Sequence, residues 1–164
     1  MNVCLRRTLE SDIDFVLSAE NADENLPFII AWTREQHMHA LSNRDLQHLI
    51  IERCVDAGPV GYVILAGLGQ VHQSIELRRM VVTEKNKGYG REALRLIKKK
   101  AFEELCAHRL WLDVKDHNLH ARHVYESEGF IVEGVLRECI KSTGKFESLV
   151  VLSILQGEYQ NACN

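Results

Sequence analysis

A glycine-rich turn that leads into an amphipathic helix is the sequence feature that most constrains the fold. The segment EKNKGYGREALRLIKKKAF covers residues 84–102, and after Gly88 and Gly90 its apolar residues recur every three or four positions. That spacing predicts a helix with one buried face. Strand-like segments lie on both sides, SIELRRMVV before and RLWLDV after. Together they predict a parallel strand-helix-strand unit with a right-handed crossover.

The turn has the composition of an anion-binding site. The first amides of a helix have no partner inside the helix, and the helix dipole adds partial positive charge there. Gly88 and Gly90 lack a Cβ atom, so a ligand can approach the backbone closely. Lys85, Lys87 and Arg91 add positive side chains. These features suit a pyrophosphate; a loop that uses its glycines only to turn is the structural alternative.

Three kinds of phosphate site compete for this turn. The P-loop pattern Gly-x-x-x-x-Gly-Lys-[Ser/Thr] occurs nowhere in the chain. A dinucleotide-binding turn fits Gly88, Gly90 and Ala93, with Asp113 as the acidic residue about twenty positions on. Such folds repeat strand-helix units, however, and here several hairpin strands precede the turn. A coenzyme A pyrophosphate site is the third possibility.

The remaining segments predict one α+β domain over residues 1–164. Ser11 is a candidate N-cap for the first helix, Thr33 and Gln36 form a capping-box pattern for the second, and Gly129 ends the last. We expect a mixed sheet of about seven strands, antiparallel in its first part and covered by helices on both faces. The expected strands are 3–7, 47–55, 60–68, 74–82, 109–114, 130–140 and 146–155, and the expected helices are 11–20, 33–41, 91–105 and 118–129.

Composition narrows the function classes. The net charge of −3 gives no reason to expect a nucleic-acid partner, and no apolar run is long enough to span a membrane. No secretory signal is expected at the N-terminus. Three histidines spaced three apart, His117, His120 and His123, drift around a helix, so we expect no metal site. Lys98, Lys99 and Lys100 are expected to form a solvated face. The five scattered cysteines, which are Cys4, Cys54, Cys106, Cys139 and Cys163, favour reduced thiols and a cytoplasmic location.

Two motifs resemble those of a known family. The segment KNKGYG, residues 85–90, resembles the Gln/Arg-x-x-Gly-x-Gly/Ala signature of the GNAT superfamily of acetyl-CoA-dependent N-acetyltransferases, with Lys85 in place of Gln or Arg. A lysine keeps the charge but loses bidentate geometry. The segment NLHARHVYESEGFIVEGVLRE is similar to a second run of the superfamily, especially in the branch with ribosomal-protein alanine and spermidine acetyltransferases. The matching residues are Asn118, Ala121, Tyr125, Gly129, Phe130, Glu133, Gly134 and Arg137.

This resemblance implies direct transfer of an acetyl group from acetyl-CoA to a primary amine in a ternary complex. Tyr125 would protonate the departing thiolate, and Glu76 is the candidate base, with a surface glutamate as the alternative. Asp113 is expected to point toward the site. Main-chain groups of Met80 and Val82 would hold the pantetheine arm and the acetyl carbonyl. The implied cofactor-binding residues are Met80, Val81, Val82, Lys85, Asn86, Lys87, Gly88, Tyr89, Gly90, Arg91, Asn118 and Tyr125.

The acceptor and two other function classes stay open. Glu20, Asp23, Glu24, Phe28 and Trp32 fall in the variable early helices and would suit a cationic amine, although a solvated acidic loop is the ordinary interpretation. A polyamine, a protein N-terminus, an amino sugar and a drug all fit. A non-catalytic acyl-CoA-binding module and a nicotinamide-dependent oxidoreductase are the alternatives. A homodimer could form through the terminal strand FESLVVLSIL, if that strand is exposed.

Overall fold

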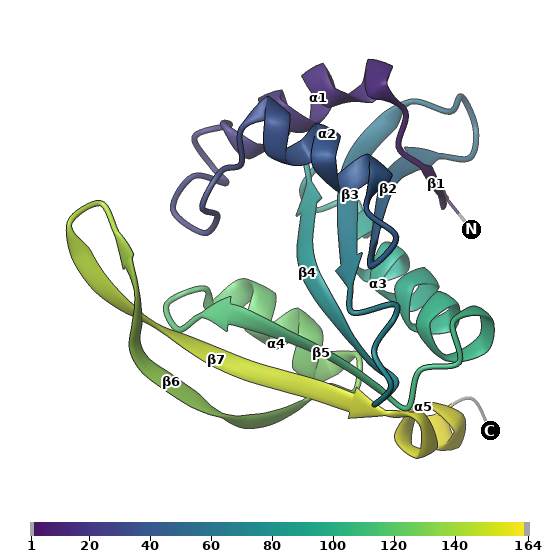
Figure 1. Cartoon of the computed structure of the whole chain (residues 1–164), viewed down its shortest axis with the longest axis vertical. Coiled ribbons are helices and arrows are strands. Elements are labelled where there is room, and N and C mark those ends of the chain that lie inside the picture. Colours follow the sequence, from purple (N-terminus) through teal and green to yellow (C-terminus); the bar gives the residue numbers. More distant parts are fainter. Residues whose placement is uncertain (1, 163–164) are drawn as a thin grey trace.

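Seven strands form one mixed sheet in the order β1-β2-β3-β4-β5-β7-β6 (Figure 1). The structure is a computed structural model that describes residues 2–162. Every neighbouring pair is antiparallel except β4 and β5, which are parallel. The strands are β1 (Val3–Arg7), β2 (Leu46–Arg53), β3 (Pro59–Ala66), β4 (Ser74–Val82), β5 (Arg109–Lys115), β6 (Ile131–Ser142) and β7 (Lys145–Leu155).

Helices cover both faces of the sheet. They are α1 (Ile13–Glu20), α2 (Arg34–Ser42), α3 (Tyr89–Lys99), α4 (Leu119–Ser127) and α5 (Gln156–Ala162). A short 3-10 turn, Glu10–Asp12, precedes α1, and a π-helical turn, Lys100–Glu104, continues α3. In Figure 1, α1 and α2 lie across one side of β2, β3 and β4, while α3 lies on the other. The mixed α+β fold expected from the sequence is therefore confirmed.

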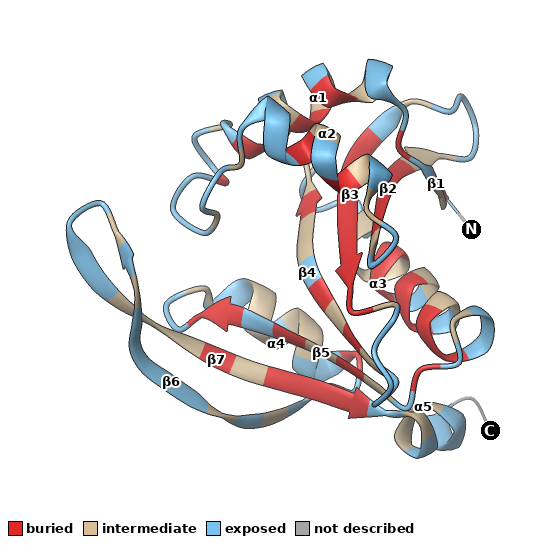
Figure 2. Ribbon diagram, in the orientation of Figure 1, coloured by how far each residue is buried: buried red, intermediate tan, exposed pale blue. Residues whose placement is uncertain are grey.

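The alternation of side chains along β2 and β3 divides the core into two parts. Ile50 and Ile64 point toward Val16 of α1, whereas Leu49 and Val63 belong to the larger core that packs α3. Successive side chains of a strand point to opposite faces. A strand with a helix on each face is buried throughout, and β3 in Figure 2 is buried along almost its whole length.

The strands β4 and β5 pair over only three positions. Ser74, Ile75 and Glu76 pair with Arg109, Leu110 and Trp111, and the two strands diverge after that. A β-bulge opposite Ile64 and Leu65 leaves Arg78 without a partner residue in β3. Bulges bend a strand and increase its twist. The second half of β4 therefore turns away from β5, and its main chain on that side pairs with no strand.

Several local expectations are confirmed and several are wrong. Thr33 and Gln36 form the expected capping box, and Gly129 has the positive φ of 94° expected of a helix stop. Ser11 is not the N-cap of α1, because a 3-10 turn precedes that helix and Asp12 occupies the cap position. The C-terminal helix α5 has no counterpart among the predicted elements.

Two further expectations fail because of tertiary contacts. Lys98 is buried rather than solvated, since its amine donates to the backbone oxygen of Glu128 at 2.6 Å and lies 3.2 Å from the Glu128 carboxylate. Strand β7 is not an exposed edge. It pairs with β5 from Arg109 to Lys115 on one side and with β6 on the other. The edge strand at this end of the sheet is β6, which is largely exposed and carries exposed apolar residues (Figure 2).

Four of the five cysteines lie in the described residues, and all four are free thiols; Cys163 lies outside them. The sulfur atoms of Cys4, on β1, and Cys54, directly after β2, lie 2.9 Å apart. The hydrogen bond with Cys54, together with burial, raises the pKa of Cys4 to about 11. The Cys4 thiol is therefore protonated at neutral pH.

The burial of Leu94 makes α3 a sensitive point of the fold. Leu94 is 0% exposed in the core under the sheet, so Leu94→Ala should lower the free energy of unfolding by about 2–5 kcal/mol. Leu9 is 60% exposed, and Leu9→Ala should change it by less than about 0.5 kcal/mol. Urea unfolding followed by circular dichroism measures both. Equal losses in the two variants would contradict the assignment of α3 to the core.

Candidate active site

A cavity of about 730 Å³ opens where β4 and β5 diverge. Its walls come from the second half of β4, the glycine turn, the first residues of α3, the end of β5, α4, and the loop between α1 and α2. Of the residues expected to bind the cofactor, the walls include Met80, Val81, Val82, Lys85, Asn86, Gly88, Tyr89, Gly90, Arg91, Asn118 and Tyr125. The volume suits a ligand of cofactor size.

The glycine turn has the backbone shape that the sequence indicates. Gly88 is the N-cap of α3 with φ of 79°, in the left-handed region, and Asn86 also has a positive φ of 60°. The first helical hydrogen bond runs from the Glu92 amide to the Gly88 oxygen. The amides before Glu92 therefore have no acceptor within the helix and lie at its positive end. This arrangement suits a phosphate group.

The cations of the turn divide into different environments. Lys85 donates to Asn25 Oδ1 at 2.9 Å, which ties the turn to the loop between α1 and α2, and burial lowers the pKa of Lys85. Arg91 lines the cavity and is held by Glu128 at 3.0 Å. Lys87 is exposed and is absent from the cavity walls. The structure thus brings Lys85 and Arg91 to the cavity and leaves Lys87 outside.

Tyr125 projects from α4 into the cavity opposite β4. Its helix starts where the side chain of Asn118 accepts a hydrogen bond from the Ala121 amide, so Asn118 is an N-cap as well as a lining residue. Tyr125 packs against the larger core and tilts against Phe130. Burial, and then the charge of Asp113, raise the pKa of Tyr125 to about 12. The phenol is therefore protonated at neutral pH.

The two acidic candidates differ in position. Asp113, near the end of β5, lines the cavity, and burial followed by the charge of Glu76 raises its pKa. Glu76 lies where β4 and β5 still pair; its carboxylate accepts from Arg78 at 2.7 Å, and it is not among the lining residues. The sequence placed Asp113 only by the direction of its strand. The tertiary structure brings Asp113 and Tyr125, which lie on β5 and α4, to the same cavity.

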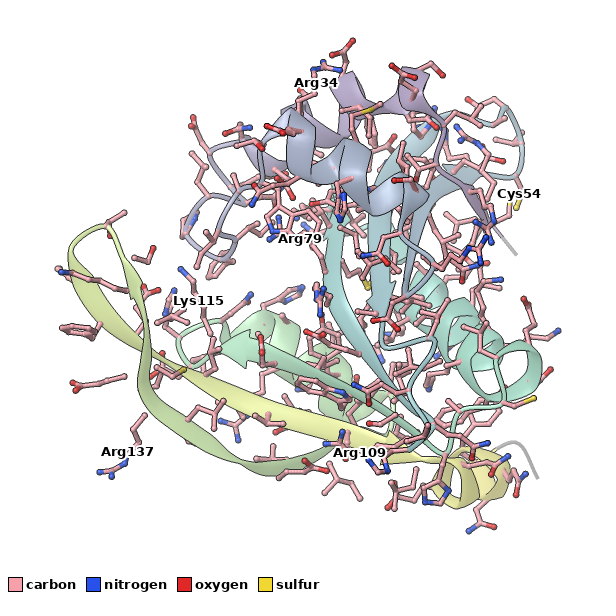
Figure 3. All side chains as sticks on the ribbon, in the orientation of Figure 1. Arg34, Cys54, Arg79, Arg109, Lys115 and Arg137 are labelled. Atoms are coloured by element: carbon pink, nitrogen blue, oxygen red, sulfur yellow. The ribbon has the colours of Figure 1, made fainter. Side chains whose placement is uncertain are left out.

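The loop between α1 and α2 supplies a wall that periodicity did not predict. Phe28, Ile29 and Ile30 line the cavity. Lys115 holds this loop by donating to the Pro27 oxygen at 3.0 Å, and it pairs with Glu147 at 2.7 Å. Figure 3 shows Lys115 at the end of β5, near the β6–β7 hairpin. Such long-range contacts leave no signal in local sequence.

Other features of the described residues bear on function. No group of three or more His, Cys, Asp or Glu side chains in residues 2–162 has the arrangement of a metal site. His117 lies against Phe28, with ring centroids 5.6 Å apart. Arg137, which matches the second motif, lies on the exposed edge strand and points outward (Figure 3). No helix in the described part of the chain is long and apolar enough to cross a membrane.

Known proteins share both the sequence pattern and the fold. The spermidine N(1)-acetyltransferase of Vibrio cholerae is 28% identical over 96% of this chain and 95% of its own length. A putative ribosomal N-acetyltransferase of Bacillus subtilis is 29% identical over 89% of this chain and 77% of its own length. The fold matches the crystal structure of spermidine N-acetyltransferase from Vibrio cholerae in complex with CoA and spermine with a TM-score of 0.87. That match has 22% identity and covers 98% of this chain and 99% of that one.

Residues 13–130 match the acetyltransferase (GNAT) family, which is well over half of the chain. The resemblance carried by the glycine turn and by the segment after Asn118 is thereby confirmed. The donor expected from it, acetyl-CoA, is the acyl donor of this family, and acetyl transfer to an amine is its reaction. The chain belongs to the acetyltransferase (GNAT) family and is an acetyl-CoA-dependent N-acetyltransferase.

Proposed function

We propose that the chain acetylates a primary amine of a polycationic acceptor, of the polyamine class, by direct transfer within a ternary complex. One observation carries this proposal: the phosphate-binding turn, Tyr125 and Asp113 open onto the same cavity. A cofactor held at the turn would extend its arm along the main chain of Met80 and Val82, where β4 pairs with no strand on that side. The acyl group would then lie between β4 and α4.

The charges around the cavity support a cationic acceptor. Most of the charged lining residues are neutralised: Arg79 pairs with Glu20, Arg91 with Glu128, Lys115 with Glu147, Arg78 with Glu76, and Glu84 with Arg53. Among the described residues, Glu24 and Asp113 are lining carboxylates that form no ion pair within 4 Å, and Lys85, at the turn, is a lining cation that interacts electrostatically with Glu24. An ammonium group gains Coulomb energy beside such carboxylates. The similarity to spermidine acetyltransferases supports the same acceptor class.

In this proposal Asp113 removes the proton of the acceptor. An alkyl ammonium must lose a proton before its nitrogen can attack, and a free amine has a pKa near 10.4. The raised pKa of Asp113 makes it a stronger base than an ordinary aspartate. Glu76, the base expected from the sequence, is paired with Arg78 and lies outside the cavity walls. We therefore propose that Glu76 acts on Asp113 and not on the substrate, because the charge of Glu76 helps to raise the pKa of Asp113.

Tyr125 would supply the proton that the leaving group needs. The amine nitrogen bonds to the thioester carbonyl carbon, the carbon–sulfur bond then breaks, and the thiolate takes a proton from the phenol. The phenolate of Tyr125 regains a proton from the nitrogen of the new amide, which completes the transfer. A thiolate has a conjugate-acid pKa near 8.5, so a phenol with a pKa of about 12 donates to it only against the gradient, and its position beside the sulfur must assist the transfer. Main-chain amides of β4 that pair with no strand would donate to the oxygen of the tetrahedral intermediate.

Two further expectations concern the location of the protein and its oligomeric state. A cytoplasmic location and homodimer formation are both expectations from the sequence. If two copies associate, we expect contact through β6, which exposes Ile131, Val135 and Leu136 along an edge. Sedimentation velocity at several concentrations tests the dimer, and a single monomer boundary throughout would exclude it.

Acetyl-CoA should stabilise the protein, because the turn and the β4 main chain bind it only in the folded state. At 100 times its dissociation constant it should raise the melting temperature by roughly 5–10 °C. NADH and ATP at the same concentration serve as controls in the same scan. A shift with NADH and none with acetyl-CoA would sink the proposal and favour the oxidoreductase alternative.

Tyr125→Phe should separate transfer from binding. It removes the proton donor and leaves the ring in its packed position, so kcat with a polyamine should fall on the order of 10²-fold. The dissociation constant for acetyl-CoA should not change. Initial rates of thiol release and isothermal titration calorimetry measure the two quantities. Failure of the wild type to acetylate any amine, despite normal acetyl-CoA binding, would instead favour the non-catalytic binding module.

Asp113→Asn should lower activity while it stabilises the fold. The folded-state pKa of Asp113 is raised above its ordinary value of 3.8, so its contribution to stability is present below pH 3.8 and is lost as pH rises through the folded pKa. At pH 7 the charged carboxylate therefore destabilises the protein, and asparagine removes that cost. We expect a higher melting temperature at pH 7, no gain near pH 3.8, and a kcat/KM at least about 10²-fold lower.

The exposed Asp116, which is outside the cavity walls, provides the matched control for Asp113. Asp116→Asn should leave both the melting temperature and kcat/KM close to those of the wild type. Glu76→Gln distinguishes the two candidate bases. A larger loss of kcat/KM in Glu76→Gln than in Asp113→Asn would return the role of base to Glu76.

A further inference from the structure

A cluster of buried polar side chains lies behind the acceptor wall and has no part in the mechanism above. We call it the Glu20 cluster: Glu20, His37, His48, Tyr62 and Arg79, contributed by α1, α2, β2, β3 and β4. Glu20, His37 and Tyr62 are each 0% exposed. Ionised side chains are almost never fully buried unless they are paired. The partners of Glu20 within this cluster therefore explain how its carboxylate can be buried.

Glu20 receives donors on both carboxylate oxygens. Its Oε2 accepts from the Trp32 amide at 2.8 Å and lies 3.2 Å from His37 Nε2. Its Oε1 accepts from the Tyr62 hydroxyl and from Arg79 Nη1. Burial alone would raise the pKa of Glu20, but hydrogen bonds from His37 and Tyr62 and the charge of Arg79 outweigh it, and the pKa falls to about 2. The carboxylate is therefore charged.

The two histidines of the cluster are linked in a chain of side-chain contacts that ends at Thr8. His37 Nδ1 lies 3.1 Å from His48 Nε2, and His48 Nδ1 lies 2.8 Å from Thr8 Oγ1. Burial, then the neighbouring His37, lowers the pKa of His48 to about 4. Arg79 is a permanent cation and forms an ion pair with Glu20.

Arg79 connects this balanced pair to the acceptor wall. Its Nη2 donates to the Ile30 oxygen at 2.8 Å, and its guanidinium lies 4.8 Å from the centroid of the Trp32 ring. Arg79 and Ile30 both line the cavity. In Figure 3, Arg79 lies between β4 and the elements above it, below α2. The guanidinium thus anchors the loop between α1 and α2 and contributes to the surface that an acceptor meets.

We propose that Glu20 is a positioning residue that sets the charge preference for the acceptor: it neutralises Arg79 and fixes the loop at Ile30 and Trp32, so that a polycation can enter. This inference rests on the proposed function. Without the carboxylate, the wall would present an uncompensated guanidinium to an incoming ammonium group. Two like charges about 10 Å apart in a medium of protein-like dielectric change an affinity roughly tenfold.

Glu20→Gln tests the proposal, because glutamine keeps the shape and one acceptor oxygen but removes the charge. Two acceptors are compared: spermidine, and a linear primary monoamine of equal length that ends in a hydroxyl group. We expect kcat/KM for spermidine to fall roughly tenfold more than kcat/KM for the monoamine. The extra loss should appear in the acceptor KM, while the KM for acetyl-CoA stays unchanged, and it should shrink at high salt.

Two further variants act on the cation itself. The double variant Glu20→Gln/Arg79→Gln carries neither charge and should restore the wild-type ratio of kcat/KM for the two acceptors. Arg79→Gln alone leaves the Glu20 carboxylate without its cation and should raise kcat/KM for spermidine relative to kcat/KM for the monoamine. This variant keeps the test possible if Glu20→Gln fails to fold. Tyr62→Phe removes a hydrogen bond without a change in charge and should leave the ratio unchanged.

Lys98→Met is the control for the loss of a buried ion pair elsewhere. Lys98 is buried against Glu128 and lies outside the cavity walls, so this variant should lower the melting temperature and leave the acceptor ratio unchanged. Equal losses with both acceptors in Glu20→Gln would show a merely structural role and overturn the inference alone. A wild type that binds acetyl-CoA but acetylates neither amine would overturn the proposed function, and the inference with it.

Discussion

The short parallel pairing of β4 with β5 is the constraint on which the rest of the structure depends. After the pair Glu76–Trp111 the two strands separate, and Leu77–Val82 has a strand partner on one side only. Unpaired main-chain groups are costly when they are buried away from water. In this protein they face a cavity, where the amides of a pantetheine arm and a thioester oxygen can pair with them. The defect in the sheet is thus the place where we propose that the donor binds.

Paired charges hold together the elements that surround this opening. Lys98 ties α3 to the end of α4, Lys115 ties β5 to the neighbouring loop and to β7, and Arg79 ties β4 to α1. Breaking a buried ion pair is strongly destabilising because one charge is left without compensation. Such pairs fix relative positions better than apolar contacts, which tolerate sliding. They suit a cavity whose walls come from several separate parts of the chain.

The chemistry of the site follows from different surroundings for two ionisable groups. Asp113 and Tyr125 line the same cavity, and desolvation raises the pKa of both. The shift makes the carboxylate a better proton acceptor and keeps the phenol protonated as a donor. By contrast, Glu20 is more deeply buried and yet has a lowered pKa, because its donors outweigh the cost of burial. Partners, rather than depth alone, decide the charge of each group.

The sequence by itself determined the order of the elements and the nature of the turn. Apolar periodicity located most of the strands and helices, since each period reflects which face is buried. Gly88, with its positive φ of 79°, and the capping box of Thr33 are local conformational requirements that a few residues express. Two motifs of fixed spacing identified the family because they combine the turn with residues of α4. These features depend on neighbours in the chain.

Only the tertiary structure decided which side chains meet. It placed Asp113 beside Tyr125 and left Glu76 with Arg78, put Lys98 inside rather than in water, and made β6 the edge in place of β7. It also assembled the cluster around Glu20 from five elements. Each outcome depends on contacts between residues far apart in sequence, whose energies no local pattern encodes. Local rules therefore fix the elements, and packing fixes the chemistry between them.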